Sequence, residues 1–212
     1  MILRPIHTSL PDGTPILIRE VAPGDADLLR LGFDHMSDAS RTSRFFGGIA
    51  QLSEAQVTAF TSPNDRDHVA IGAAVPMEDG GLDPAGTARF VRLPDDPRRA
   101  EFALTVVDRY QRRGLGSLLL GVLARVACHN GIDRLLGYVM RSNRGMLSLL
   151  DGLDARREPG PDPSVHQMIL EVHDDPGDYP ATPAGDAMRR ADMMARMSLV
   201  PDAMPPDPDP DP

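Results

Sequence analysis

The segment from residue 99 to residue 130 constrains the fold of this chain more than any other part of the sequence. Residues 99–107 read as a strand rich in Val, and the turn that follows is Gln111-Arg112-Arg113-Gly114-Leu115-Gly116. From Gly114 to Asn130 the apolar residues recur at the spacing of an amphipathic helix, and Asn130-Gly131 is a helix stop signal. The sequence therefore predicts a strand, a tight turn and a long helix in direct succession.

A helix that begins after such a turn is typical of an anion-binding site. The first N–H groups of a helix have no partner within the helix, and the helix dipole adds partial positive charge there. The glycines would let the backbone approach a phosphate, and Arg112 and Arg113 would add charge. Gly-x-Gly alone is a weak signal, so a turn that needs small residues only for steric reasons stays the alternative.

Two known phosphate-binding loops are excluded. A P-loop requires a Lys after its second glycine, and this chain contains no Lys because all 22 of its basic residues are Arg. The dinucleotide fingerprint requires a third small residue where Leu119 stands. It also belongs in a βαβ unit, whereas the runs before the turn read as antiparallel hairpins.

The other segments predict an α/β protein. Strand patterns occupy residues 16–20, 68–75, 86–93, 99–107, 134–140 and 165–172. Helix patterns occupy residues 23–36, 37–46, 53–62, 114–130 and 143–150. Ser53 and Gln56 form a capping box at the start of the third helix, which should end before Pro63.

Composition predicts one domain at residues 1–172 and an acidic Pro/Asp-rich tail at 173–212. The tail holds nine Asp and three Arg, so it carries most of the net charge of −9 and leaves the body nearly neutral. A nearly neutral body does not favour nucleic acid as a partner.

Residues 184–199 could form a Met-rich helix with Met188, Met194 and Met197 on one side. That helix would be either marginal and poorly ordered or docked on the body or a partner.

Several classes of protein are disfavoured by what the sequence lacks. No apolar run approaches the length of a membrane helix, and the first residues do not resemble a signal peptide. Cys128 is the single cysteine, which excludes an internal disulfide and a multi-Cys zinc site. The Asp65, Asp67 and His68 group reads as a loop before a strand. We therefore expect a cytoplasmic protein with no metal and no membrane partner.

Beyond these patterns, Leu104 to Gly116 resembles the signature of the GNAT N-acetyltransferases, Gln/Arg-x-x-Gly-x-Gly/Ala at the end of the fourth strand. Within that superfamily the chain is most similar to bacterial protein lysine acetyltransferases. The matching pieces, in family order, are Arg44-Phe45-Phe46-Gly47, Leu52-Ser53-Glu54, Arg99-Ala100-Glu101-Phe102-Ala103, Gly131-Ile132, and Asn143 followed by Met146-Leu147. The resemblance implies a mixed, mainly antiparallel sheet with helices on both faces, splayed near Val106.

The resemblance also implies a set of residues that bind acetyl-CoA as co-substrate. Backbone groups of Val106 and Val107 would pair with the pantetheine arm, and an amide near Val107 would stabilise the oxyanion. Asn143 would contact CoA, although it or Ser142 also reads as a simple helix cap. The turn of the signature would bind the pyrophosphate through Gln111, Arg112, Arg113, Gly114, Leu115, Gly116 and Ser117.

Glu101 is the expected general base. On a strand, Glu101, Ala103 and Thr105 point to one face, which places the carboxylate on the strand that approaches the thioester. The alternative is a solvated Glu paired with Arg99 or Arg89. Many family members place a Tyr after the Asn-containing helix as general acid, but residues 149–158 contain no Tyr, so the acid is unassigned.

The expected function is acetylation of an amine, chiefly a protein lysine such as one on an acyl-CoA synthetase. A small-molecule amine acetyltransferase and a non-catalytic acyl-CoA-binding regulatory protein are the alternatives. A shallow acidic groove would suit a protein loop, and an enclosed acidic pocket would suit a small amine. Both a monomer and a homodimer are compatible with the sequence.

Overall fold

The computed structural model describes residues 2–62 and 65–200. The final Pro/Asp run from residue 201 lies outside this range. The third helix ends at Thr61, before Pro63 as expected. The strands are β1 (Ile2–Leu3), β2 (Ile6–Ser9), β3 (Pro15–Glu20), β4 (His68–Pro76), β5 (Leu82–Leu93), β6 (Asp96–Val106), β7 (Arg134–Met140), β8 (Arg156–Pro159), β9 (Val165–Glu171) and β10 (Leu199–Val200). The α-helices are α1 (Ala26–Asp34), α2 (Asp38–Phe45), α3 (Glu54–Thr61), α4 (Leu115–His129), α5 (Arg144–Asp151) and α6 (Pro183–Ser198).

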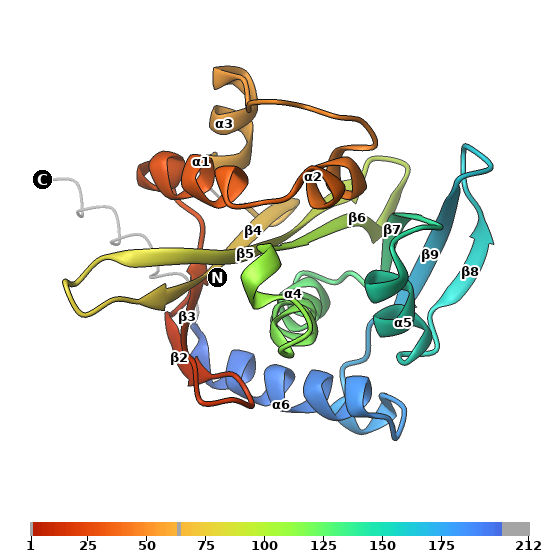
Figure 1. Ribbon diagram of the computed structural model, residues 1–212. Helices are drawn as coiled ribbons and strands as arrows, with labels where there is room; N and C mark the ends of the chain where they lie inside the picture. The colour runs from red at the N-terminus through yellow and green to blue at the C-terminus, as the bar shows by residue number, and fades with distance from the viewer. Residues whose placement is uncertain (1, 63–64, 201–212) are drawn as a thin grey trace, which may run out of the picture.

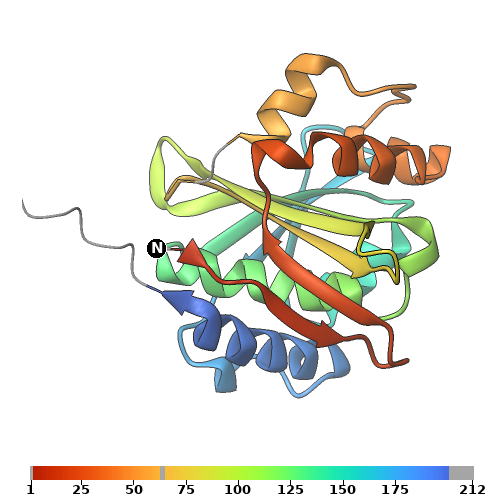
Figure 2. The ribbon, with the colours of Figure 1, turned by 90° about the vertical axis from the view of Figure 1, so that its left-hand side faces the viewer.

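One large sheet forms the centre of the molecule. Its eight strands lie in the order β2-β3-β4-β5-β6-β7-β9-β8, and every neighbouring pair is antiparallel except β6 and β7. Helices α1, α2 and α3 lie over one face, whereas α4 covers the other face with α6 beneath it (Figures 1 and 2). The predicted fold class, a mainly antiparallel mixed sheet with helices on both faces, is confirmed.

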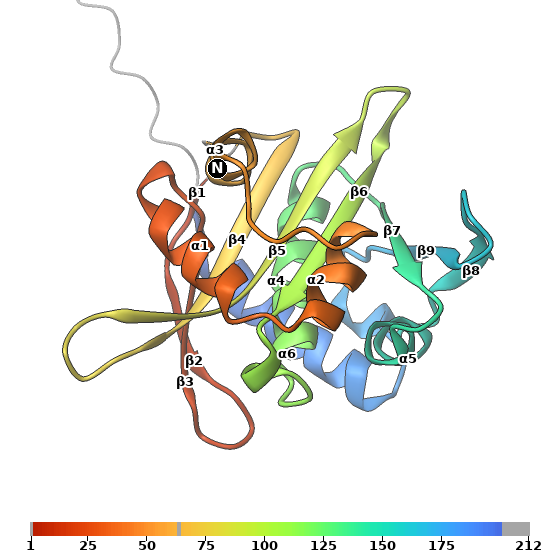
Figure 3. The same ribbon diagram turned by 45° about the horizontal axis from the view of Figure 1, so that its top comes forward.

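The parallel pair β6–β7 is joined over a short stretch only. Arg99–Glu101 pair with Arg134–Leu136, and the ladder ends there. Beyond Glu101 the two strands turn away from each other (Figure 3). The ring of Phe102 fills the space beside Gly137, where an added Cβ would lie 2.5 Å from the ring edge. The splay therefore begins after Glu101, five residues before the expected position at Val106.

Helix α4 lies between the sheet and α6 and is buried almost all round. Leu115, Leu119, Leu120 and Leu123 are fully buried. A helix that is apolar on most of its circumference must have packing partners on more than one side. The sheet supplies one partner and α6 supplies the other, which fixes the position of the helix N-terminus.

Helix α6 docks on α4 through small side chains rather than through a methionine stripe. Met188, Ala191 and Ala195 are fully buried, whereas Met197 is 78% exposed. Gly121 of α4 permits the close approach, because an added Cβ would lie 2.5 Å from the Cβ of Ala191. Of the two alternatives for this helix, the structure shows docking on the body.

Buried charges accompany this contact. Arg125 of α4 donates to Asp174 at 2.9 Å and lies 3.8 Å from Asp192 of α6. Asp192 accepts from Arg196 at 2.5 Å. Removing one member of a buried pair leaves the other charge unpaired, which is costly, so the pairs favour this docked arrangement over others.

Local signals in the sequence predicted helix starts well and short edge strands poorly. Ser37 caps α2, and Ser53 and Gln56 form the expected capping box of α3. Strands β1, β2, β8 and β10 were not predicted. Each has four residues or fewer, which is too short for a periodic pattern to stand out.

Replacing Gly121 with Ala should destabilise the protein, although the same change in an exposed helix is stabilising. The added methyl would overlap Ala191, and overpacking of this kind costs about 1–3 kcal/mol. Gly145→Ala in α5 is the matched control, since its Cβ would meet nothing closer than 3.9 Å. Urea denaturation should show a loss for the first variant and no loss for the second. Equal midpoints would contradict the α4–α6 contact.

Candidate active site

The cleft opened by the splay of β6 and β7 is the main cavity described by the structure. It has a volume of about 630 Å³ and is walled by β6, β7, the turn before α4 and the start of α5. Eight of the predicted site residues line it: Glu101, Val106, Gln111, Arg112, Gly114, Gly116, Ser117 and Asn143. Three others, Val107, Arg113 and Leu115, do not.

The turn before α4 presents backbone N–H groups to this cleft. Arg112 has a φ of 59° and Gly114 a φ of 90°, and Gly114 is the N-cap of α4. The first amides of the helix follow immediately and lack intrahelical partners. Left-handed residues next to helix-initiating amides form an anion-binding concavity. The geometry therefore suits a pyrophosphate.

Leu115 and Arg113 hold this turn in place from the side away from the cleft. The Leu115 side chain is fully buried in the core. The Arg113 guanidinium donates to Asp12 at 2.6 Å and also to Thr14, both in the β2–β3 hairpin. The hydrogen bond from Arg113, together with hydrogen bonds from Thr14, holds the pKa of Asp12 well below its usual range. The expected contribution of Arg113 charge to the phosphate site is therefore not supported, and Arg112 is the arginine of the turn that lines the cleft.

A second set of hydrogen bonds ties the turn to α2. Asp108 accepts from the backbone N–H of Ser37 at 3.0 Å and from the hydroxyls of Ser37 and Ser40 at 2.6 and 3.0 Å. Burial opposes ionisation of Asp108, but these hydrogen bonds outweigh it and lower its pKa. The Gln111 side-chain amide donates to Ser40 at 3.1 Å and to the Val106 carbonyl at 3.0 Å. Gln111 thus positions the turn.

The backbone of Val107 is occupied by the protein itself. Its N–H donates to the Ala85 carbonyl at 2.9 Å, and its carbonyl accepts from the Tyr110 N–H at 2.8 Å. Stabilising an oxyanion would require the N–H to leave Ala85, whereas the carbonyl keeps a second lone pair with which it could pair with a pantetheine arm. Both expected roles of Val107 stay predictions, and Val106 lines the open edge of β6.

Glu101 lies where the parallel ladder ends. Its backbone pairs with Val91 on β5 and Leu136 on β7, and its side chain is exposed in the cleft. Within residues 2–62 and 65–200, no ion pair involves Glu101. The pairings with Arg99 or Arg89 are therefore not formed, and Arg99 lies 3.9 Å from Asp96 instead.

Two further polar residues of the cleft come from β7 and α5. The Asn143 side chain accepts from the Met146 N–H at 3.1 Å, so it caps α5 while it lines the cleft, and both of its expected roles are compatible. Tyr138 also lines the cleft and is 36% exposed. The sequence reading missed it, although alternation along β7 places it on the same face as Leu136, the partner of Glu101.

A second, smaller cavity lies beneath α1, α2 and α3 on the Glu101 face of the sheet. Its volume is about 80 Å³, and its walls are mainly apolar. Arg44 lines both cavities and so stands between them.

Among the described residues, no three His, Cys, Asp or Glu side chains gather where they could hold a metal ion. Nor does any helix in that part of the chain have the length and apolarity needed to cross a membrane.

Comparison with known proteins identifies the family. The profile of the acetyltransferase (GNAT) family matches residues 45–151, half of the chain and the region that holds the cleft. This chain belongs to the GNAT acetyltransferase family. The protein is therefore an acetyltransferase, and the matched region includes Glu101, the turn before α4 and Asn143.

Two curated relatives are each 31% identical to the chain. Acetyltransferase PA5475 of Pseudomonas aeruginosa matches over 76% of this chain and 88% of its own length. Acetyltransferase Pat of Mycolicibacterium smegmatis matches over 72% of this chain but only 45% of its own length. The chain thus spans less than half of Pat.

Solved structures agree with the fold. The GNAT domain of S. lividans PAT is 26% identical with a TM-score of 0.73, over 79% of this chain and 97% of that domain. A cAMP-binding acyltransferase from Mycobacterium smegmatis is 26% identical with a TM-score of 0.57, over 91% of this chain and 56% of that protein. At 16% identity and a TM-score of 0.59, the structure of yncA from Salmonella typhimurium with its cofactor acetyl-CoA shows the fold alone.

Replacing Gly114 with Val should abolish coenzyme A binding. A β-branched residue is strongly disfavoured at a φ of 90°, so the turn and the first amides of α4 would shift. Gly131→Val, at the other end of α4, is the matched control because Gly131 has a φ of 80° and lies outside the cleft. Calorimetry should detect coenzyme A binding to the control only. Binding to both variants at equal affinity would contradict the assignment.

Proposed function

We propose that this acetyltransferase transfers an acetyl group from acetyl-CoA to the side-chain amine of a protein lysine, with Glu101 as general base. The observation that carries the proposal is the position of Glu101. Its carboxylate has no ion-pair partner in the described ranges, and it shares one cleft with the N-terminus of α4. A base and a pyrophosphate site in one cleft suit direct transfer from an acyl-CoA.

Different parts of the cleft would bind different parts of acetyl-CoA. The turn at Arg112 to Ser117 would bind the pyrophosphate through backbone N–H groups and the Arg112 charge. The pantetheine arm would follow the edge of β6 that β7 leaves open, which includes Val106. The thioester would then lie beside the point where the strands part, near Glu101. Asn143 would contact the coenzyme from the start of α5.

Glu101 would prepare the amine for attack. The side-chain amine of a lysine ordinarily has a pKa of about 10.4, so it arrives protonated and must lose a proton before it can act as a nucleophile. The Glu101 carboxylate would accept that proton, directly or through a water molecule. The amine nitrogen would then form a bond to the thioester carbon, and the resulting tetrahedral intermediate would break its C–S bond to give an amide and CoA. The nitrogen would lose its second proton to water, and the released thiolate would take a proton from water.

The rim of the cleft favours a protein as acceptor. Phe46 is 50% exposed and Tyr138 is 36% exposed, and both line the cleft together with Glu101. Exposed aromatic side chains are enriched where proteins contact each other. The resemblance of the sequence to bacterial protein lysine acetyltransferases supports the same acceptor class. The acidic groove expected for such an acceptor is not seen, since Glu101 and Asp108 are the only carboxylates in the described lining.

Replacing Glu101 with Gln should lower kcat by about 10²–10⁴-fold while leaving acetyl-CoA affinity unchanged, because the amide keeps the shape but cannot accept the proton. Glu158→Gln on β8 is the matched control, since Glu158 lies outside the cleft and pairs with Arg156. Coenzyme A release should be followed with acetyl-CoA and lysine peptides, small amines and acyl-CoA synthetase proteins. Coenzyme A binding without turnover on any acceptor would favour the non-catalytic alternative.

A further inference from the structure

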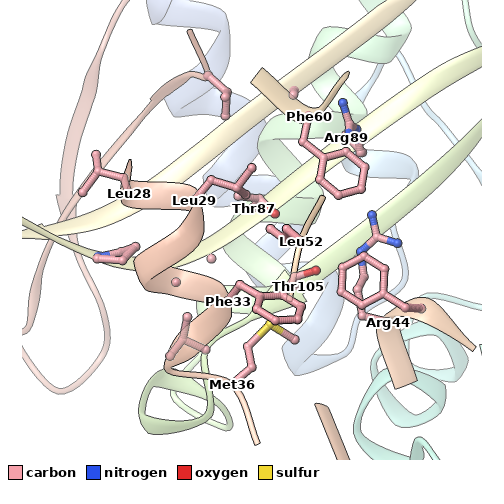
Figure 4. A pocket seen from close by; sticks show the side chains of 17 residues that line it. Leu28, Leu29, Phe33, Met36, Arg44, Leu52, Phe60, Thr87, Arg89 and Thr105 are labelled. Atoms are coloured by element: carbon pink, nitrogen blue, oxygen red, sulfur yellow. The ribbon is translucent and has the colours of Figure 1, made fainter. Parts of the chain in front are cut away.

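The smaller cavity beside the active-site cleft combines apolar walls with two arginines. Leu28, Leu29, Phe33, Met36, Leu52 and Phe60 supply most of the wall, and Arg44 and Arg89 reach the cavity from α2 and β5. Figure 4 shows the two guanidinium groups on the same side of the cavity as the Phe60 ring. Apolar walls with a charged end suit a ligand group that is itself part apolar and part anionic.

The cavity lies next to the proposed base by strand register. Arg89 pairs with Ala103, and Glu101 is the next residue of β6 on the same face. Thr87 and Thr105, two residues from Arg89 and Ala103 on their strands, pair with each other and also line the cavity. Diagonal neighbours on one face of a sheet lie within reach of long side chains. A molecule whose amine meets Glu101 can therefore place another group at Arg89.

Neither arginine has a carboxylate partner within the part of the chain that the structure describes. Arg44 contacts the rings of Phe45 and Phe60, with its guanidinium carbon 5.1 and 5.9 Å from their centroids. Arg89 donates to the Ala59 carbonyl at 3.3 Å, contacts His68 Nε2 at 2.5 Å and lies over Phe60. Its Nε atom is buried and has no hydrogen-bond partner.

Two such cations are unfavourable in an apolar cavity without an anion. Burial lowers the pKa of Arg44, and burial together with the nearby Arg44 charge lowers the pKa of Arg89 to about 10. Burial of His68 and the Arg89 charge also lower the His68 pKa, which favours a neutral imidazole. The Asp65 charge partly offsets the lowering of the His68 pKa, and the Glu101 charge does the same for Arg44. Neither carboxylate forms an ion pair with these arginines. Two arginines without an ion-pair partner among the described residues therefore give the cavity a net positive charge that a bound anion would neutralise.

We infer that this cavity binds a carboxylate that the acyl acceptor carries in addition to its amine. The inference rests on the proposed function for the position of the amine, and it narrows the acceptor class to amines with an acidic group. Arg44 and Arg89 bind the carboxylate, and the aromatic and aliphatic wall packs against the carbon chain beside it. Such an acceptor is either a free amino acid or a protein lysine with an acidic residue beside it.

Matched acceptors test the inference and distinguish the two sources. Lysine and lysinamide differ only in the carboxylate, as do peptides with Glu or Gln beside the target lysine. We expect kcat/KM to be about tenfold or more higher for the carboxylate member of one pair, because a charge-assisted hydrogen bond is lost in the other member. Preference within the first pair identifies a free amino acid, and preference within the second identifies a protein. Equal kcat/KM values within both pairs would overturn the inference.

Arg44→Met and Arg89→Met should each remove the preference, mainly through KM. Because Arg89 lies outside the active-site cleft, Arg89→Met should turn over the carboxylate-free acceptor as before. Arg157→Met is the matched control, because Arg157 lies on β8 and pairs with Asp151 at 2.7 Å. This control should keep the wild-type preference. A preference that survives in both cavity variants would show that the carboxylate is bound elsewhere.

A binding experiment separates this inference from the proposed function. Saturation-transfer NMR with butyrate and its uncharged analogue butyramide requires no turnover. We expect butyrate to bind the wild-type protein and the Arg157→Met control, and to lose binding in both cavity variants. Butyrate binding with no acetylation of any amine would contradict the proposed function but support the cavity as a carboxylate site. Equal or absent binding of the two probes would overturn the inference.

Discussion

The early end of the β6–β7 ladder is the constraint on which the rest of the active site depends. Parallel pairing continues only to Glu101 and Leu136, and the Phe102 ring lies against Gly137 where the strands part. An open strand edge leaves backbone groups that a ligand can pair with, and here that edge faces a cleft rather than solvent at the rim of the sheet. One local departure from sheet geometry thus opens the cleft and places Glu101 where the strands part.

The helix that completes the coenzyme site is held from three directions. The sheet and α6 bury α4 almost all round, Arg113 fastens the preceding turn to the β2–β3 hairpin, and Asp108 fastens it to α2. Backbone N–H groups that do not move need no reorganisation when a charged ligand arrives, which is how preorganised sites gain affinity. The hydrogen bonds from α2 to Asp108 connect the turn before α4 to the helix that carries Arg44. The same helix therefore helps to position residues of both cavities.

Sequence patterns predicted the elements whose signals are local. The junction at residues 99–130 and the capping box at Ser53 follow from adjacent residues, and strand alternation placed Glu101 on a defined face. The fold class followed from the resemblance to the GNAT family. What could not be predicted depends on residues far apart in the chain. Arg113 meets Asp12, and the Arg44 charge comes near Arg89 only after α2 folds over β6. The docking of α6 likewise depends on a glycine in another helix, and the hydrogen bond from the Val107 N–H depends on Ala85 in the neighbouring strand β5.

A crystal structure of the protein with coenzyme A bound tests the central claim most directly. The account predicts pyrophosphate oxygens within hydrogen-bonding distance of backbone N–H groups between Arg112 and Ser117, and the thiol beside Glu101 where β6 and β7 part. Coenzyme A bound with its pyrophosphate away from the start of α4, or with its thiol outside the gap between these strands, would contradict it.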